Sequence, residues 1–199
     1  MKSLLALLLA TSAFAADTIR TEYDVDYLGS GRKEKADLYL PANPQPGQRF
    51  PAVVIIHGGG WRSGDRSQHH PLAQQLANRG YVCFTPQYRL STEALYPAAV
   101  HDIKTSIRWV KDHAKQYGVD TNKVVVLGFS AGGQLAALIG NTNGQPFFEG
   151  NNGTYAGSSA VQAIVDIDGT LSFIHPESGE GDDSKKISAA TNWFGASRK

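Results

Sequence analysis

The sequence lacks several features that would place it in other classes of protein. It has a single cysteine, Cys83, so no internal disulfide can form. No apolar run reaches the roughly 18 residues that a membrane-spanning helix needs, and we expect no membrane span. The formal net charge is only +1, which argues against a nucleic-acid partner. No set of His, Cys and Asp residues has the spacing of metal ligands, so we predict no metal and no cofactor.

The N-terminal residues have the pattern of a secretory signal peptide. Lys2 supplies a positive start, residues 4–10 are apolar, and A-F-A at 13–15 is a small-x-small cleavage site. We therefore predict a signal peptide at 1–15, a single domain at 16–199, and a secreted or periplasmic protein. A buried N-terminal helix is the alternative interpretation of the same residues.

The hydrophobic pattern after these residues predicts an α/β fold. Residues 20–28 and 35–40 alternate polar and apolar, which predicts two antiparallel strands with one solvent-exposed face. Continuous apolar runs predict strands of a parallel sheet, buried on both faces, at 52–56, 81–84, 124–127 and 163–167. The predicted helices lie at 66–79, at 97–117, from Ser130 onward, and near the C-terminus with Ile187, Ala190, Thr191 and Phe194 on its apolar face. The alternation predicts a mostly parallel sheet with helices on both faces, and ligands bind at the carboxyl ends of such strands.

A short glycine-rich motif lies between one of these strands and the next helix. Residues 128–132 read G-F-S-A-G, and this context predicts a nucleophile elbow with Ser130 as the catalytic nucleophile. Gly128 and Gly132 leave the room that a tight turn needs, and the helix N-terminus favours developing negative charge. An incidental serine in a phosphate-binding turn is the alternative. However, no P-loop lysine follows, and the glycine spacing is not G-x-G-x-x-G.

A second glycine-rich motif, H-G-G-G-W at 57–61, follows another predicted strand. Acyl transfer needs N–H donors that stabilise an oxyanion, and glycines let backbone N–H groups point into a site. We predict that Gly59, Gly60 and Ala131 supply the oxyanion hole, with Gly58 as the alternative to one of them.

The two residues that flank these glycines have different predicted roles. His57 ends the strand before the motif, and we interpret it as a residue that holds the loop by hydrogen bonding rather than as the catalytic base. Trp61 is predicted at the edge of the substrate pocket, where it would contact the acyl group. Ordinary core packing is the alternative for this tryptophan.

These motifs together resemble a known family. HGGGW at 57–61, GFSAGG at 128–133, KADLYLP at 35–41 and YPAAVHDIKTSIRWV at 96–110 are similar to the hormone-sensitive-lipase-like branch of the α/β hydrolases. The closer resemblance is to the bifunctional feruloyl and acetylxylan esterase type, to which SSAVQAIVDIDGTLSF at 158–173 is also similar. The resemblance implies an α/β-hydrolase fold, a serine carboxylesterase that forms an acyl-enzyme, and acetyl or feruloyl esters of plant cell-wall polysaccharide as substrates.

The rest of a catalytic triad is not recognisable. In this fold the acid and the histidine follow the serine, but the strands that carry them in the family are not visible in residues 131–199. We therefore expect a C-terminally incomplete domain in which Ser130 alone is weakly active or idle. Asp168, after the predicted strand at 163–167, is a weak substitute for the acid, and His175 is a weak substitute for the base.

The titratable residues before Ser130 are interpreted as non-catalytic. His101 and Asp102 are adjacent on one predicted helix, where neighbouring residues do not face each other, so we expect surface or packing roles. The remaining histidines are expected at the surface: His69, His70 and His113.

Two other functions remain open at this point. A serine peptidase or a lipase of the same fold is one, although the polar segments 141–160 and 175–186 do not look like the apolar lid of a lipase. A catalytically inactive or truncated carbohydrate-binding protein of the hydrolase fold is the other, and the missing acid and histidine favour it. The expected partner in the leading interpretation is an esterified polysaccharide or oligosaccharide.

Overall fold

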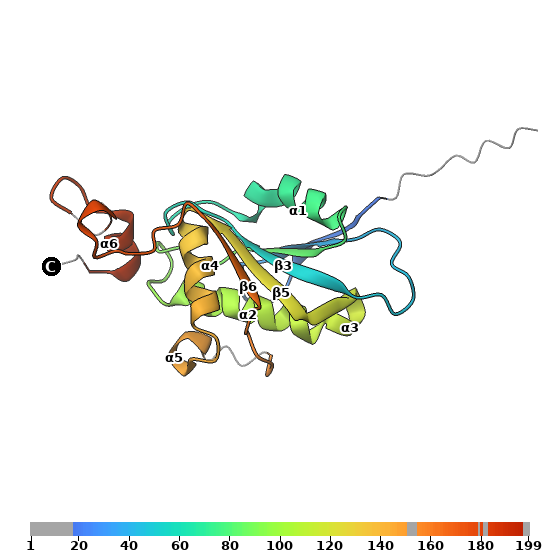
Figure 1. Cartoon of the computed structure of the whole chain (residues 1–199). Coiled ribbons are helices and arrows are strands. Elements are labelled where there is room, and N and C mark those ends of the chain that lie inside the picture. The colour runs from blue at the N-terminus through green and yellow to red at the C-terminus, as the bar shows by residue number, and fades with distance from the viewer. Residues whose placement is uncertain (1–17, 151–154, 179, 181–182, 197–199) are drawn as a thin grey trace, which may run out of the picture.

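A computed structural model describes residues 18–150, 155–178, 180 and 183–196, so the signal peptide predicted at 1–15 lies outside the described residues. These described residues form one six-stranded sheet in the order β1-β2-β4-β3-β5-β6 (Figure 1). The strands are β1 Arg20–Val25, β2 Ala36–Leu40, β3 Phe50–Ile56, β4 Val82–Pro86, β5 Val119–Phe129 and β6 Ala163–Ile167. Strands β4, β3, β5 and β6 are parallel, and β1 and β2 join them in antiparallel pairs. The predicted strands and the mostly parallel sheet are confirmed.

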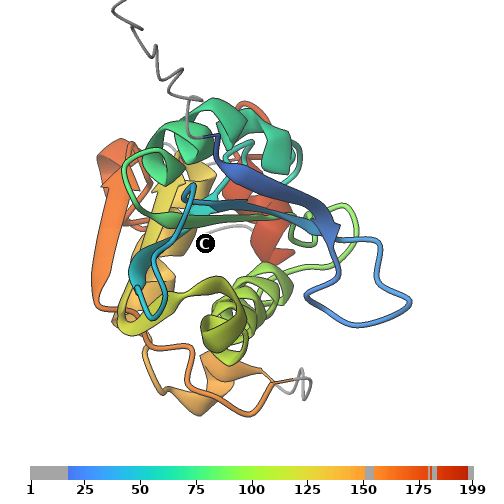
Figure 2. The same ribbon diagram turned by 90° about the vertical axis from the view of Figure 1, so that its right-hand side faces the viewer.

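Helices cover both faces of this sheet, as predicted. The helical segments are η1 Arg66–His69, α1 His70–Ala77, α2 Ala98–Asp112, α3 Ala114–Tyr117, α4 Ala131–Asn141, α5 Pro146–Glu149, η2 Pro176–Ser178 and α6 Ala189–Phe194. Helix α1 lies on one face, and α2 and α4 lie on the other (Figure 2). No helix in the described ranges is both long and apolar enough to cross a membrane.

Three details differ from the sequence pattern. The single helix predicted at 97–117 is broken at His113, and Gly118 ends the second piece in the left-handed conformation (φ 68°). Strand β2 has no solvent-exposed face, because Leu38 packs in the α2 core and Tyr39 packs in the core beneath α1. Of the apolar face predicted for the last helix, Ala190 is buried but Ile187 and Phe194 are exposed, and Trp193 is the other buried residue of α6.

Strand β6 is the other departure from the expected burial. Its sequence predicts a strand covered on both faces, yet Ile164, Val165 and Ile167 are 37%, 40% and 40% exposed. In the part of the chain that the structure describes, β6 is the outermost strand of its side of the sheet. Its apolar side chains are therefore only partly covered, although Ile164 packs near Gly140 of α4.

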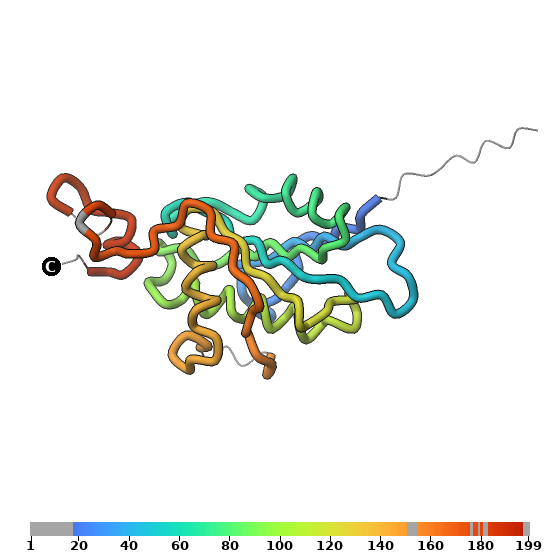
Figure 3. Tube along the Cα trace, in the orientation of Figure 1, coloured from blue at the N-terminus to red at the C-terminus, as the bar shows by residue number. Residues whose placement is uncertain are grey.

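The strand register places the two glycine-rich motifs together. Ile56 of β3 is level with Gly128 of β5, and Phe129 is level with Ile167 of β6. The segments that follow these strands therefore leave the sheet at the same edge. Beyond this edge the chain runs away from the sheet to α6, at the end of the molecule opposite the loop 41–47 (Figure 3).

Candidate active site

The turn that carries Ser130 has the geometry of a strained elbow. Strand β5 ends at Phe129, helix α4 begins at Ala131, and Ser130 between them has φ 53° and ψ −121°. A non-glycine residue in such a sparsely populated region costs of order 1–3 kcal/mol. The Ser130 N–H donates to Ile167 O at 2.8 Å, and Ser130 O accepts from the Gln134 N–H at 3.0 Å. The turn is thus held from both sides, and it leaves the Ser130 side chain exposed.

The glycines on either side of Ser130 are required by close packing. A Cβ on Gly128 would lie 2.0 Å from Gly132 O, and a Cβ on Gly132 would lie 2.2 Å from Ile56 O. These contacts involve backbone oxygens, which cannot move aside without displacing a strand or a helix. The G-x-S-x-G pattern is therefore a steric requirement of this turn.

The loop 57–61 lies directly against this turn. A Cβ on Gly58 would lie 2.8 Å from Phe129 O and 3.4 Å from Ser130 Cβ. Gly59 has φ 115° and Gly60 has φ 58°, conformations that favour glycine. The structure thus brings together the two motifs that the sequence predicts as one site, and it packs Gly58 against the serine turn.

The N–H donors predicted for an oxyanion hole come from two segments of this site. Ala131 is the first residue of α4, so its N–H has no partner within the helix. Gly59 and Gly60 lie in the neighbouring loop, where Gly59 O accepts from the N–H groups of Arg62 and Ser63 at 3.1 and 3.0 Å. These bonds close a tight turn around the glycines. The roles of the Gly59, Gly60 and Ala131 N–H groups as donors to a substrate stay predictions.

His57 is buried beneath the glycine loop. Its Nδ1 lies 2.8 Å from Gly58 O, and its ring stacks on Tyr88 with the centroids 4.3 Å apart. Burial lowers the pKa of His57 to about 4, although the bond to Gly58 and the charge of Asp65 act in the opposite direction. The ring is neutral at neutral pH, so Nδ1–H donates to the Gly58 carbonyl. This geometry agrees with a loop-holding residue rather than a catalytic base.

Trp61 lies inside the protein rather than at an open pocket edge. Its side chain is only 2% exposed, its Nε1–H donates to Gln134 Oε1 at 3.1 Å, and its ring stacks on Trp193 at 4.9 Å. The predicted contact with the acyl group needs exposed ring surface, so we correct this placement in favour of core packing. Through Trp193, Trp61 also links the glycine loop to α6. This link joins segments far apart in the chain, and no local sequence pattern predicts it.

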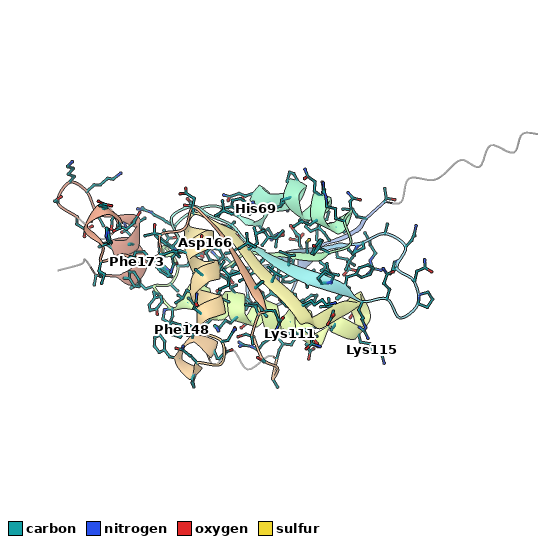
Figure 4. The ribbon with its side chains drawn as sticks, viewed as in Figure 1. His69, Lys111, Lys115, Phe148, Asp166 and Phe173 are labelled. Carbon is teal, nitrogen blue, oxygen red and sulfur yellow. The ribbon has the colours of Figure 1, made fainter. Side chains whose placement is uncertain are left out.

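The weak candidates for acid and base lie on the open side of the site. Asp168 is exposed at the end of β6 with φ 60°, and His175 is exposed, with its Nδ1 accepting from the Glu177 N–H at 3.2 Å. The neighbouring Asp166 instead accepts the Gly169 N–H at 3.0 Å and so shapes the loop. In Figure 4, Asp166 lies at the end of β6, and Phe173 lies further along the chain, toward α6. The structure thus leaves the roles of Asp168 and His175 as predictions.

The three histidines expected at the surface are in fact partly buried. His69 stacks on Phe129 at 4.5 Å, directly below the serine turn, and burial lowers its pKa. His70 Nε2 lies 2.8 Å from Asp37 Oδ2, and the His113 ring stacks on Trp109 at 4.2 Å. The contacts of His69 and His70 join segments that are distant in the sequence, so a helical pattern does not reveal them. His113 and Trp109 are four residues apart, a spacing at which side chains on a helix do meet.

The two titratable residues expected in surface or packing roles on the helix at 97–117 make tertiary contacts. Asp102 is fully buried and pairs with Arg89, while His101 Nε2 lies 3.0 Å from Phe147 O. Within the described ranges, no group of three or more His, Cys, Asp and Glu side chains is arranged to hold a metal ion. The site consists of an exposed serine hydroxyl at a helix N-terminus, with a glycine-rich loop packed against its turn. Such an arrangement can attack a carbonyl carbon and stabilise the resulting oxyanion.

Comparisons with known proteins agree with this geometry. The family described as BD-FAE matches residues 36–199. The chain is similar to "Esterase LipQ" of Mycobacterium tuberculosis, with 30% identity over 155 residues that cover 77% of this chain and 36% of that protein. It spans about a third of the length of the curated relatives it matches, with 36% and 35% for two of them.

Solved structures of other proteins have a similar fold. The bifunctional GH43-CE of Bacteroides eggerthii matches with a TM-score of 0.77 and 27% identity, over 89% of this chain and 24% of that one. A truncated form of a carbohydrate esterase from gut microbiota matches with a TM-score of 0.73 and 30% identity, over 81% of this chain and 61% of that one. These likenesses confirm the α/β-hydrolase fold that the sequence resemblance implies.

Proposed function

The chain belongs to the BD-FAE family, and from this premise we propose that the protein carrying it hydrolyses carboxylic esters with Ser130 as the nucleophile. The observation that carries the proposal is the strained Ser130 turn packed against Gly58 of the glycine loop. Strain at one residue persists only where the surrounding structure enforces it, and it gathers at functional sites. The similarity to named esterases supports the same activity.

The proposed reaction has two steps. The Ser130 oxygen forms a bond to the acyl carbon while its proton passes to a base, and the carbonyl oxygen becomes an oxyanion. The N–H groups of Gly59, Gly60 and Ala131 stabilise that charge in the proposed oxyanion hole. The carbon–oxygen bond to the alcohol then breaks, and the alcohol leaves with the proton. Water attacks the acyl-enzyme in the same way and releases the acid.

The base and the acid that assist Ser130 are the less developed part of the proposal. Asp168 and His175 are the candidates within the described residues, and both lie on the exposed side of the site. A serine without a well-placed base keeps only the residual catalysis that binding and the oxyanion hole supply. We therefore assign the full activity to the protein that carries this chain rather than to these residues alone.

The proposed substrates are acetyl or feruloyl esters on plant cell-wall polysaccharide. The support is the family membership and the likeness to a structure described as a carbohydrate esterase. A secreted or periplasmic location, which the N-terminal pattern predicts, would bring the enzyme to such a polymer.

The experiment compares the full-length protein with its Ser130→Ala variant on p-nitrophenyl acetate. Loss of a nucleophile lowers kcat by about 10⁴-fold or more in enzymes of this type. We expect that loss with an unchanged melting temperature, because the exposed hydroxyl has no core packing to lose. Undiminished hydrolysis would contradict the assignment. Release of acetate or ferulate from acetylated and feruloylated xylan oligosaccharides then tests the substrate class.

A further inference from the structure

A short segment after β4 packs behind the glycine loop. Tyr88 is fully buried, its hydroxyl donates to His57 O at 2.9 Å, and its ring stacks on the His57 ring with an interplanar angle of 12°. Three residues later, the Ser91 N–H donates to Trp61 O at 2.7 Å. One segment therefore holds the loop 57–61 at its first and at its last residue.

The loop needs such support because of its composition. Three consecutive glycines have more backbone freedom than any other tripeptide, and two of these three have positive φ. Oxyanion donors work only when they lie about 2.7–3.1 Å from the developing charge. A misplacement of about 1 Å can cost on the order of 10²-fold in rate. The fixed points on either side of the glycines therefore determine how well their N–H groups are aimed.

The segment that carries Tyr88 is itself anchored by a buried ion pair. Arg89 donates from Nε to Asp102 Oδ2 and from Nη2 to Asp102 Oδ1, both at 2.8 Å, and its backbone N–H donates to Oδ2 at 3.0 Å. Asp102 is fully buried on the long helix α2, and Arg32 Nη2 approaches its Oδ2 at 3.4 Å. Paired, charge-assisted bonds of this kind are strong and fix geometry.

We infer that Tyr88 is a positioning residue for the oxyanion hole and that the Arg89–Asp102 pair fixes Tyr88 in place. Tyr88 acts through the His57 carbonyl and the His57 ring, not through the substrate. The chain of contacts runs from helix α2 through Arg89 and Tyr88 to the residue that precedes the glycines. This inference rests on the proposed esterase function, because it assigns a role to residues behind that site.

The test uses a matched pair of tyrosines in the full-length protein. Tyr27, like Tyr88, is fully buried, but its hydroxyl donates to Gln87 O rather than to the glycine loop. Gln87 is also held by its own N–H, which donates to Lys35 O at 2.8 Å, so the segment keeps its place without that bond. Each Tyr→Phe change removes one buried hydroxyl and keeps the ring.

We expect Tyr88→Phe to lower kcat for p-nitrophenyl acetate about tenfold or more, with KM changed less than twofold. Tyr27→Phe should keep kcat within twofold of the parent. Its melting temperature should fall by about as much as that of Tyr88→Phe, because both variants lose one buried hydroxyl. A Tyr88→Phe enzyme with kcat within twofold of the parent would overturn the inference. An equal loss of kcat in both variants would also overturn it, since the effect would then be general destabilisation.

A second variant keeps the test open if Tyr88→Phe fails to fold. Arg89→Lys keeps the charge beside Asp102 but cannot reproduce the paired bonds. We expect the same fall in kcat as for Tyr88→Phe, with KM changed less than twofold. An unchanged kcat would overturn the inference. The Ser130→Ala enzyme distinguishes a failure of the proposed esterase function from a failure of the positioning role of Tyr88. If it hydrolyses the ester at the parental rate, the proposed function fails. If it is inactive while Tyr88→Phe and Arg89→Lys match the parent, only the positioning role fails.

Discussion

Two regions meet at the carboxyl end of the sheet, and they differ in how closely their atoms are packed. On the β3–β5 side, Gly58 lies so close to the serine turn that one added methyl group would meet Phe129 O at 2.8 Å. On the β6 side, Ile167 and Asp168 are exposed. The dense side holds the nucleophile and the candidate oxyanion donors, and the open side holds the candidate acid and base. The difference indicates that this chain holds the groups proposed to stabilise the oxyanion tightly in place, and the groups that would transfer the proton less tightly.

Among changes that leave the Ser130 hydroxyl in place, the largest effect should come from adding a methyl group on the β3–β5 side. We expect Gly58→Ala to lower kcat by about 10²–10³-fold, the loss associated with a disabled oxyanion hole. The added Cβ must push the loop away from Phe129 O, because backbone atoms are in its way. Steady-state hydrolysis of p-nitrophenyl acetate by the full-length protein measures this loss.

Gly157→Ala is the control for this change. An added Cβ on Gly157 meets no atom within 4 Å, so its kcat should stay within twofold of the parent. If the kcat of Gly58→Ala also stays within twofold of the parent, the close packing around Ser130 has no bearing on catalysis. The difference in packing between the two regions would then have no functional consequence.

The second effect concerns stability on the dense side at acid pH. His57 is held neutral in the folded state with a pKa of about 4, mainly by burial, against about 6.5 in an unfolded chain. Between these values the unfolded state binds more protons, so stability is complete above pH 6.5 and falls as the pH drops toward 4. A shift of this size corresponds to at most about 3 kcal/mol. Urea unfolding at a series of pH values measures the loss.

The His57→Gln variant isolates this contribution. Without the imidazole, the fall in unfolding free energy between pH 6.5 and pH 4 should be smaller than in the parent. His69 remains in both proteins, and its lowered pKa contributes in the same direction. Identical pH profiles for the two proteins would show that the burial of His57 does not control acid stability.

The smallest effects should come from the open side. We expect Asp168→Asn and His175→Ala each to lower kcat by less than tenfold, because both residues are exposed. The measurement is again kcat on p-nitrophenyl acetate. A loss near 10⁴-fold for Asp168→Asn would instead identify it as the acid of a triad and would make the open side as important as the dense one.

The parts of the fold that local sequence determines were predictable. The parallel strands are apolar runs, β1 and β2 alternate polar and apolar residues, and the serine turn needs small residues at Gly128 and Gly132, so these features can be recognised without a structure. The contacts around the site could not be predicted in the same way. Tyr88 on His57 and Trp61 on Trp193 join segments separated by long stretches of chain, and no periodic pattern encodes such pairs.

Burial was the least predictable property. An apolar run predicts a covered strand, but β6 is the outermost strand of the described sheet and is partly exposed. Asp102 shows the opposite case, since a charged residue on a helix is usually solvated, whereas the arrangement of Arg89 and Arg32 allows it to be buried. Charge compensation by distant partners cannot be read from one helix alone.

The role of Ser130 as the nucleophile can be tested directly with a covalent probe. A fluorophosphonate reacts with an activated serine hydroxyl and leaves a covalent adduct, and mass spectrometry of the digested full-length protein locates that adduct. We predict a single modified peptide that contains Ser130, and no such adduct in the Ser130→Ala variant. An adduct on a different serine, or ester hydrolysis by a protein whose Ser130 stays unmodified, would contradict it.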